Sequence, residues 1–162
     1  DALQRDRHGA LADRDGAGDA VCRGGTAWRL GHGKQDGPEF GVRRLTYFPS
    51  ATASLFRRTF FERVGPFEEA FFAYLEDVDL GLRAAVAGLA GIYVPQAVAY
   101  HRGSATSGAW SSAMVEWITC HQLLLLAKFY PTRLLMLYAR PILTAQLLWA
   151  GLAVSRGGAS AW

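Results

Sequence analysis

The amino-acid sequence predicts an α/β fold class in which a mixed region of strands and helices is followed by apolar helices. Short runs of β-prone, apolar residues at 46–56, 91–95 and 97–101 are typical of strands. Residues 75–87 carry apolar side chains three or four positions apart, which is the spacing of one helix face. From residue 111 onward the chain is largely apolar and free of strand signals. We therefore expect strands and helices to mix before this point and helices alone after it.

Composition and charge limit the classes of partner. Of the 162 residues, 51% are hydrophobic, so the chain can bury a core and is not disordered. The net charge of +3 does not indicate a nucleic-acid partner, and no basic stripe with interleaved aromatics is present. No acid follows Glu116, whereas the basic residues after it are Lys128, Arg133, Arg140 and Arg156. A basic, apolar C-terminal part favours contact with a negatively charged membrane surface.

The cysteines and the first residues bear on location. Cys22 and Cys120 are far apart and match no zinc or redox spacing, which favours a reducing compartment over a disulfide framework. Residues 1–7 are polar, lack the apolar core of a signal peptide and do not begin with Met. We expect a segment of a longer cytoplasmic protein that is peripheral to the inner face of the cell membrane.

The first part of the chain is predicted to be dominated by loops. Residues 1–45 are rich in Gly, Asp and Arg and show little periodicity. Asp13-Arg14-Asp15 has the Asp-x-Asp form of many metal sites, but no apolar strand leads into it. We interpret it as a loop sequence and not as the metal motif.

A buried strand and a short helix are expected next. Residues 46–56 are small, apolar and β-prone, which predicts the buried strand. Residues 57–65 predict a helix that ends at Gly65, because Pro66 cannot continue it.

Three acids then stand within four positions at the start of the predicted helix 75–87. They are Glu76, Asp77 and Asp79. The exposed N–H groups and the positive dipole end of a helix stabilise negative charge, so this start favours ionised carboxylates. An acidic first turn on a solvated helix face is the alternative, and Gly88 is the expected C-cap.

The three acids are expected to differ in their surroundings. Asp79 and Arg83 are four positions apart in the favourable acid-first order, which indicates a structural ion pair. Glu76 and Asp77 point about 100° apart on a helix, so they should serve different purposes. Asp77 and Asp79 are about 200° apart, which argues against a metal hydrolase that uses both acids with His101.

The strand predicted at 97–101 ends in a histidine. The preceding run 91–95 is stopped by Pro95, and the run 97–101 leads into a Gly/Ser/Thr loop. His101 is placed to coordinate a metal or meet a phosphate, and a capped surface histidine is the alternative.

The C-terminal part predicts two helical segments. The first ends at Tyr130-Pro131, and the second, 134–154, is apolar but interrupted by Arg140-Pro141. An arginine and a proline within the segment disfavour a clean membrane span. We expect an interfacial or re-entrant helix pair, with packing in a soluble domain as the alternative. His121 is more typical of a core or surface residue than of a ligand.

An ordered set of motifs between residues 51 and 131 resembles the C-terminal half of family 2 glycosyltransferases, in particular their rhamnosyltransferase-like branch. The segments that carry the resemblance are 54–58, 64–69, 71–83, Gly88, 94–95 and 100–104. Phe67-Glu68-Glu69 departs from the usual Phe-Asp-Glu of that family but keeps its acidity. The family's Asp-x-Asp metal motif and nucleotide-binding strands would lie upstream of residue 1.

The resemblance implies a partial GT-A fold. Residues 1–110 would form the acceptor-side half of the catalytic domain, and residues 111–162 a helical, basic, membrane-associated tail. It implies an inverting, metal-dependent transfer from a UDP- or dTDP-sugar to a glycan or lipid-linked acceptor. Mg²⁺ or Mn²⁺ would be held mostly by ligands outside this chain. A non-catalytic membrane-surface module derived from such an enzyme is the competing hypothesis.

The resemblance also implies roles for individual residues. Asp77 would be the general base, and Glu76 and Tyr74 would contact the acceptor. His101 would be a metal ligand. The diphosphate would be bound by Arg102, Ser104 and Thr106. Asp79 and Arg83 would form a structural pair.

Overall fold

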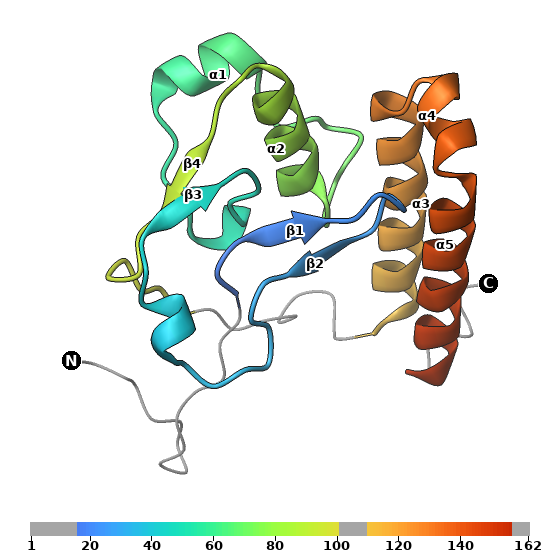
Figure 1. The fold of residues 1–162 in the computed structure, drawn as a ribbon, viewed down its shortest axis with the longest axis horizontal. Helices are drawn as coiled ribbons and strands as arrows, with labels where there is room; N and C mark the ends of the chain where they lie inside the picture. Colours follow the sequence, from blue (N-terminus) through green and yellow to red (C-terminus); the bar gives the residue numbers. More distant parts are fainter. Residues whose placement is uncertain (1–15, 101–109, 157–162) are drawn as a thin grey trace.

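The computed structural model describes residues 16–100 and 110–156, which form a mixed α/β arrangement with two small sheets and several helices (Figure 1). The strands are β1 (Asp19–Val21), β2 (Ala27–Arg29), β3 (Arg44–Thr46) and β4 (Gly91–Tyr93). The α-helices are α1 (Arg58–Val64), α2 (Glu76–Val86), α3 (Ser112–Phe129), α4 (Thr132–Leu137) and α5 (Ala139–Ser155). Short 3₁₀ turns cover Pro38–Phe40 and Ala51–Ala53. This arrangement is compatible with part of a larger domain.

Each sheet consists of one antiparallel pair of strands. β1 pairs with β2, with Asp19 opposite Arg29, and β3 pairs with β4, with Arg44 opposite Tyr93. The described part of residues 1–45 is mostly loop, as predicted, but it also contains β1, β2 and the start of β3, which the sequence did not predict. Each strand has only three residues, which is too short for an alternating pattern to stand out in the sequence.

Two strand predictions are wrong. Only Thr46 of the predicted strand 46–56 is in a strand, residues Ala51–Ala53 form a 3₁₀ turn, and Leu55 is fully exposed. Pro49 lacks the N–H that a strand ladder needs, so a strand that covered all of 46–56 is disfavoured. The predicted run 91–95 is correct in β4, but residues 97–100 are exposed and not a strand. His101 lies outside the described residues.

The two helix predictions in the middle of the chain are confirmed. α1 ends at Gly65, whose φ of 80° is a conformation that glycine adopts most readily. After α2, Gly88 N–H donates to the Ala85 carbonyl and Leu89 N–H donates to the Ala84 carbonyl. These bonds form a Schellman motif, in which the left-handed Gly88 satisfies carbonyls at the helix end.

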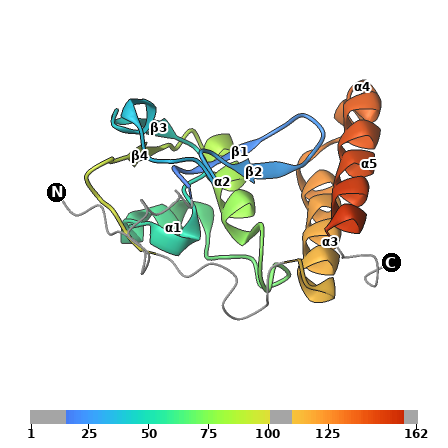
Figure 2. The ribbon, with the colours of Figure 1, turned by 90° about the horizontal axis from the view of Figure 1, so that it is seen from below.

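The C-terminal elements form a helical hairpin, in which α3 lies beside α5 (Figures 1 and 2). Ser111 caps α3, since its hydroxyl accepts a bond from the Met114 N–H at 3.2 Å. The second predicted segment is interrupted at Tyr138 and not at Arg140-Pro141. Pro141 lies in the first turn of α5, where a missing N–H leaves no helical bond unmade. Among the described helices, none combines the length and the hydropathy that crossing a membrane requires.

The core connects the α/β part to the helical hairpin. Phe71, Val78 of α2 and Leu125 of α3 form a buried cluster, and Val21 and Ala27 of the β1–β2 pair pack against it. The turn between β1 and β2 lies close against α3 of the hairpin. A Cβ atom added to Gly25 would be only 2.6 Å from a methyl carbon of Leu126, so a larger residue there would require Leu126 to move. These contacts fix α3 against the segment that leads into α2.

Candidate active site

The candidate site is the start of α2, and a strained turn leads into it. Tyr74 and Leu75 have φ of 67° and 66°, so two successive non-glycine residues are left-handed. That conformation costs roughly 1–2 kcal/mol per residue, so surrounding contacts must hold it in place. Leu75 is the N-cap of α2 and makes no side-chain capping bond. The first turn of α2 therefore depends on other elements for its geometry.

Helix α3 supplies contacts to this turn. Nδ1 of His121 lies 2.8 Å from the carbonyl oxygen of Tyr74. The His121 ring packs against Phe71 with 4.9 Å between ring centroids. Trp117, one helical turn earlier, packs against the rings of Phe72 and Tyr74, with 5.4 and 6.3 Å between the ring centroids. The turn and the acids after it are thus braced from the C-terminal part of the chain.

Asp77 is held by backbone donors. Its Oδ2 accepts a hydrogen bond from the Ala51 N–H at 3.1 Å, and its Oδ1 accepts one from the Val78 N–H at 2.9 Å. The residue is only 9% exposed and lies in the first turn of α2. These bonds fix the carboxylate at the positive end of the helix dipole. The Ala51 bond also ties the Ala51–Ala53 turn to α2.

Glu76 differs from its neighbour. Burial raises the pKa of the Glu76 carboxyl, and the adjacent charge of Asp77 raises it further. Its Oε2 atom is buried and has no hydrogen-bond partner within the described parts of the chain. A carboxyl in this state can accept a hydrogen bond when ionised and donate one when protonated. Glu76 and Asp77 therefore lie in different surroundings, while the different roles expected for them stay a prediction.

Asp79 is completely buried and neutralised by two cations. Arg83 Nε lies 2.9 Å from its Oδ2, which is the expected ion pair, and Lys128 Nζ lies 2.8 Å from its Oδ1. Arg83 also donates to the carbonyls of Val64 and Pro66. Sequence reasoning missed the role of Lys128, because the contact joins α2 to a distant helix and no local spacing signals it.

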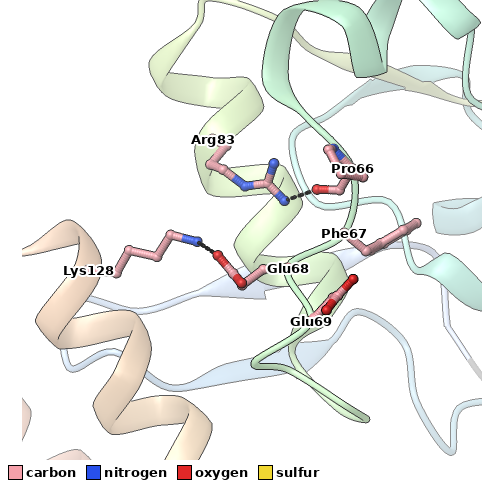
Figure 3. Close-up of a pocket in the computed structure, with 6 residues that line it drawn as sticks. All are labelled: Pro66, Phe67, Glu68, Glu69, Arg83 and Lys128. Atoms are coloured by element: carbon pink, nitrogen blue, oxygen red, sulfur yellow. Dashed lines mark hydrogen bonds and ion pairs between the residues drawn. The ribbon is translucent and has the colours of Figure 1, made fainter.

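A hollow of about 310 Å³ lies beside this ion pair (Figure 3). It is lined by Pro66, Phe67, Glu68, Glu69, Arg83 and Lys128. Two of its charged groups pair with each other: Lys128 lies 3.2 Å from Glu68, and this bond lowers the pKa of the Glu68 carboxyl. Glu76 and Asp77 do not line it. The hollow is therefore a structural junction and not the candidate site.

The predicted metal and diphosphate contacts are not among the residues that the structure describes. His101, Arg102, Ser104 and Thr106 lie outside the described residues, as do Asp13 and Asp15. Within residues 16–100 and 110–156, no three His, Cys, Asp or Glu side chains converge as metal ligands. The described residues therefore do not by themselves fit Mg²⁺ or Mn²⁺.

Comparison with known proteins gives two curated relatives. Both are N-acetylglucosaminyl-diphospho-decaprenol L-rhamnosyltransferases of Mycobacterium tuberculosis, from strains CDC 1551 / Oshkosh and ATCC 25618 / H37Rv. Each is 44% identical over 59 residues, which are 36% of this chain and 19% of the relative. Part of this chain is related to a glycosyltransferase. The match covers about a fifth of the relatives' length. No protein-family model and no solved structure matches the chain.

Proposed function

We propose that this chain supplies the acceptor side of an inverting glycosyltransferase that moves a sugar from a nucleotide-sugar donor to a glycan or lipid-linked acceptor. The observation that carries the proposal is the pair Glu76 and Asp77 at a braced helix start, in a chain related to a rhamnosyltransferase. The name of that relative includes a diphospho-decaprenol, which supports a lipid-linked acceptor here. A partial GT-A fold would accommodate the acceptor-side half.

Asp77 is the proposed general base. The acceptor hydroxyl gives its proton to Asp77 while its oxygen forms a bond to the anomeric carbon and the bond to the diphosphate breaks. The backbone N–H groups of Ala51 and Val78 hold the carboxylate in place before the reaction. Glu76, with its raised pKa, and Tyr74 would hold and orient the acceptor hydroxyls.

Donor contacts are proposed from the resemblance. His101 would bind the metal ion, and Arg102, Ser104 and Thr106 would bind the diphosphate of a UDP- or dTDP-sugar. Mg²⁺ or Mn²⁺ would neutralise the leaving diphosphate when bound, mostly through ligands outside this chain.

We further propose that the outer face of α4 and α5 rests on the inner surface of the cell membrane. Its exposed apolar side chains are Met136, Leu137, Leu143, Leu147, Leu148 and Leu152. Arg133 and Arg140 are exposed on the same two helices, and no acid follows Glu116. An apolar helix face with basic residues binds anionic lipid by insertion and by charge. The same face would serve a non-catalytic membrane-surface module, so activity must decide between the two.

The transferase proposal is tested in the complete enzyme with Asp77→Asn. The amide retains an acceptor oxygen for the Ala51 N–H but cannot take the proton. We expect kcat to fall by about 10²–10⁴-fold, with donor affinity by calorimetry unchanged. Glu69→Gln, at an exposed acid, is the matched control and should keep full turnover. Near-normal turnover of Asp77→Asn would rule out the base assignment, and absence of transfer by the wild type would favour the non-catalytic module.

The membrane proposal is tested by flotation with vesicles. The wild type should float with vesicles that contain anionic phospholipid and less with neutral ones. Replacing Leu147 and Leu148 together by Gln should abolish flotation. Leu55→Gln should not abolish flotation, since Leu55 is even more exposed than these two leucines but lies far from the hairpin in sequence. Equal flotation of all three proteins would refute this surface.

A further inference from the structure

His121 connects the helical hairpin to the residues that precede the two candidate carboxylates. The side chain is buried, and its Nδ1 contacts the carbonyl of Tyr74 at 2.8 Å. A carbonyl oxygen only accepts hydrogen bonds, so Nδ1 must carry the proton and donate. Both the neutral Nδ1–H tautomer and the imidazolium can make this bond. The His121 ring therefore donates to the carbonyl at the start of the turn.

The carbonyl that His121 binds belongs to the first of two left-handed residues. Tyr74 and Leu75 both have positive φ, and Glu76 follows directly as the first residue of α2. Relaxation of either residue to negative φ would reorient the chain that enters the helix. Leu75 offers no side-chain cap, so the helix start has no local substitute for this contact. The direction of Glu76 and Asp77 thus depends on the turn that His121 holds.

Neighbouring positions of α3 hold the same segment. Trp117, His121 and Leu125 recur every four residues, so they share one face of the helix. Trp117 packs on Phe72 and Tyr74, and Leu125 belongs to the cluster around Phe71. Of these three α3 residues, His121 makes the polar contact to the strained backbone.

We infer that His121 is a positioning residue, which orients the Glu76–Asp77 pair for catalysis through its hydrogen bond to the Tyr74 carbonyl. This inference rests on the proposed transferase function. His121 itself touches neither donor nor acceptor, and its contribution is the geometry of the helix start. Its loss should therefore lower turnover without weakening donor binding.

The test compares three substitutions in the complete enzyme. His121→Phe keeps a ring against Phe71 but removes the donor. His121→Asn places an amide N–H near the position of Nδ1, whereas His121→Gln places it one bond further out. A displacement of about 1 Å at reacting groups costs up to about 10²-fold in rate. We expect kcat to fall about 10- to 100-fold for Phe and Gln and about threefold or less for Asn, with donor KM unchanged in all three.

Two results would overturn the inference. One is wild-type kcat in His121→Phe, and the other is equal loss in the Asn, Gln and Phe variants, which would indicate a packing role only. Amide hydrogen exchange at Val78 and Asp79 provides a readout without activity. Exchange of these two amides should be faster than in the wild type for His121→Phe and His121→Gln, and should stay slow for His121→Asn. If the wild type transfers no sugar but exchange follows this order, the transferase proposal fails while the brace is confirmed; unchanged exchange in the Phe variant refutes the brace.

Discussion

Helix α2 and the outer face of α4–α5 both depart from the rule that charged side chains are exposed and apolar ones buried. α2 buries two carboxylates, Asp77 and Asp79, whereas α5 exposes a row of leucines that includes Leu147 and Leu148. Buried acids and exposed apolar patches are the informative departures, because apolar residues scattered on a surface are common. The difference is that α2 places charged groups inside the protein, whereas α5 leaves apolar groups in contact with solvent.

The buried ion pair gives the largest expected effect on stability. Arg83→Met leaves the fully buried Asp79 with Lys128 alone and removes donors from two carbonyls. We expect a loss of about 3–5 kcal/mol in the free energy of unfolding, measured by urea denaturation. Arg58→Met is the matched control, because Arg58 pairs with Glu62 at the same helical spacing but on the surface. It should cost under about 0.5 kcal/mol, and equal losses would show that burial does not separate the two pairs.

A leucine in the core and a leucine on the α4–α5 face should also differ in how much they contribute to stability. Leu125 is 2% exposed in the core, while Leu148 is 70% exposed. Leu125→Ala should cost about 3 kcal/mol, because it leaves a cavity beside Phe71. Leu148→Ala should change the midpoint of urea unfolding very little and instead weaken vesicle flotation. A large stability loss at Leu148 would mean that this face is packed against protein.

The smallest expected effect is the pH dependence that Glu76 gives to the free energy of unfolding. Its pKa is raised in the folded state, so the folded protein binds more protons than the unfolded chain above the ordinary pKa of a glutamate. Stability contributed by this group therefore falls as pH rises through the window up to the raised pKa, and then stays constant. Glu76→Gln should remove this slope and make the protein slightly more stable at neutral pH. Thermal unfolding at several pH values measures it, and a steeper slope in the variant would contradict the assignment.

Local patterns could predict the helices but not the tertiary contacts. Gly65 and Gly88 marked the ends of α1 and α2, and the i,i+4 spacing of Asp79 and Arg83 indicated their ion pair. Such signals lie within a few residues of one another. The start of the candidate site at Glu76 and Asp77 was also evident from local charge.

The sequence could not predict how distant elements complete this site. The contact of His121 with the Tyr74 carbonyl and that of Lys128 with Asp79 join α3 to the start of α2, although these residues are far apart in the sequence. The apolar run 46–56 was read as a buried strand, but Pro49 and the contact of Ala51 with Asp77 favour a turn. Neither a strained turn of non-glycine residues nor a remote partner leaves a periodic signal.

The burial of Asp79 has a consequence for the order in which the protein assembles. Translation proceeds at about 5–20 residues per second, so Lys128 is synthesised roughly a few seconds after Asp79. During that interval Asp79 has its local partner Arg83 but not the lysine that completes its neutralisation. Helix α2 therefore cannot bury Asp79 beside both of its charge partners until α3 has been made.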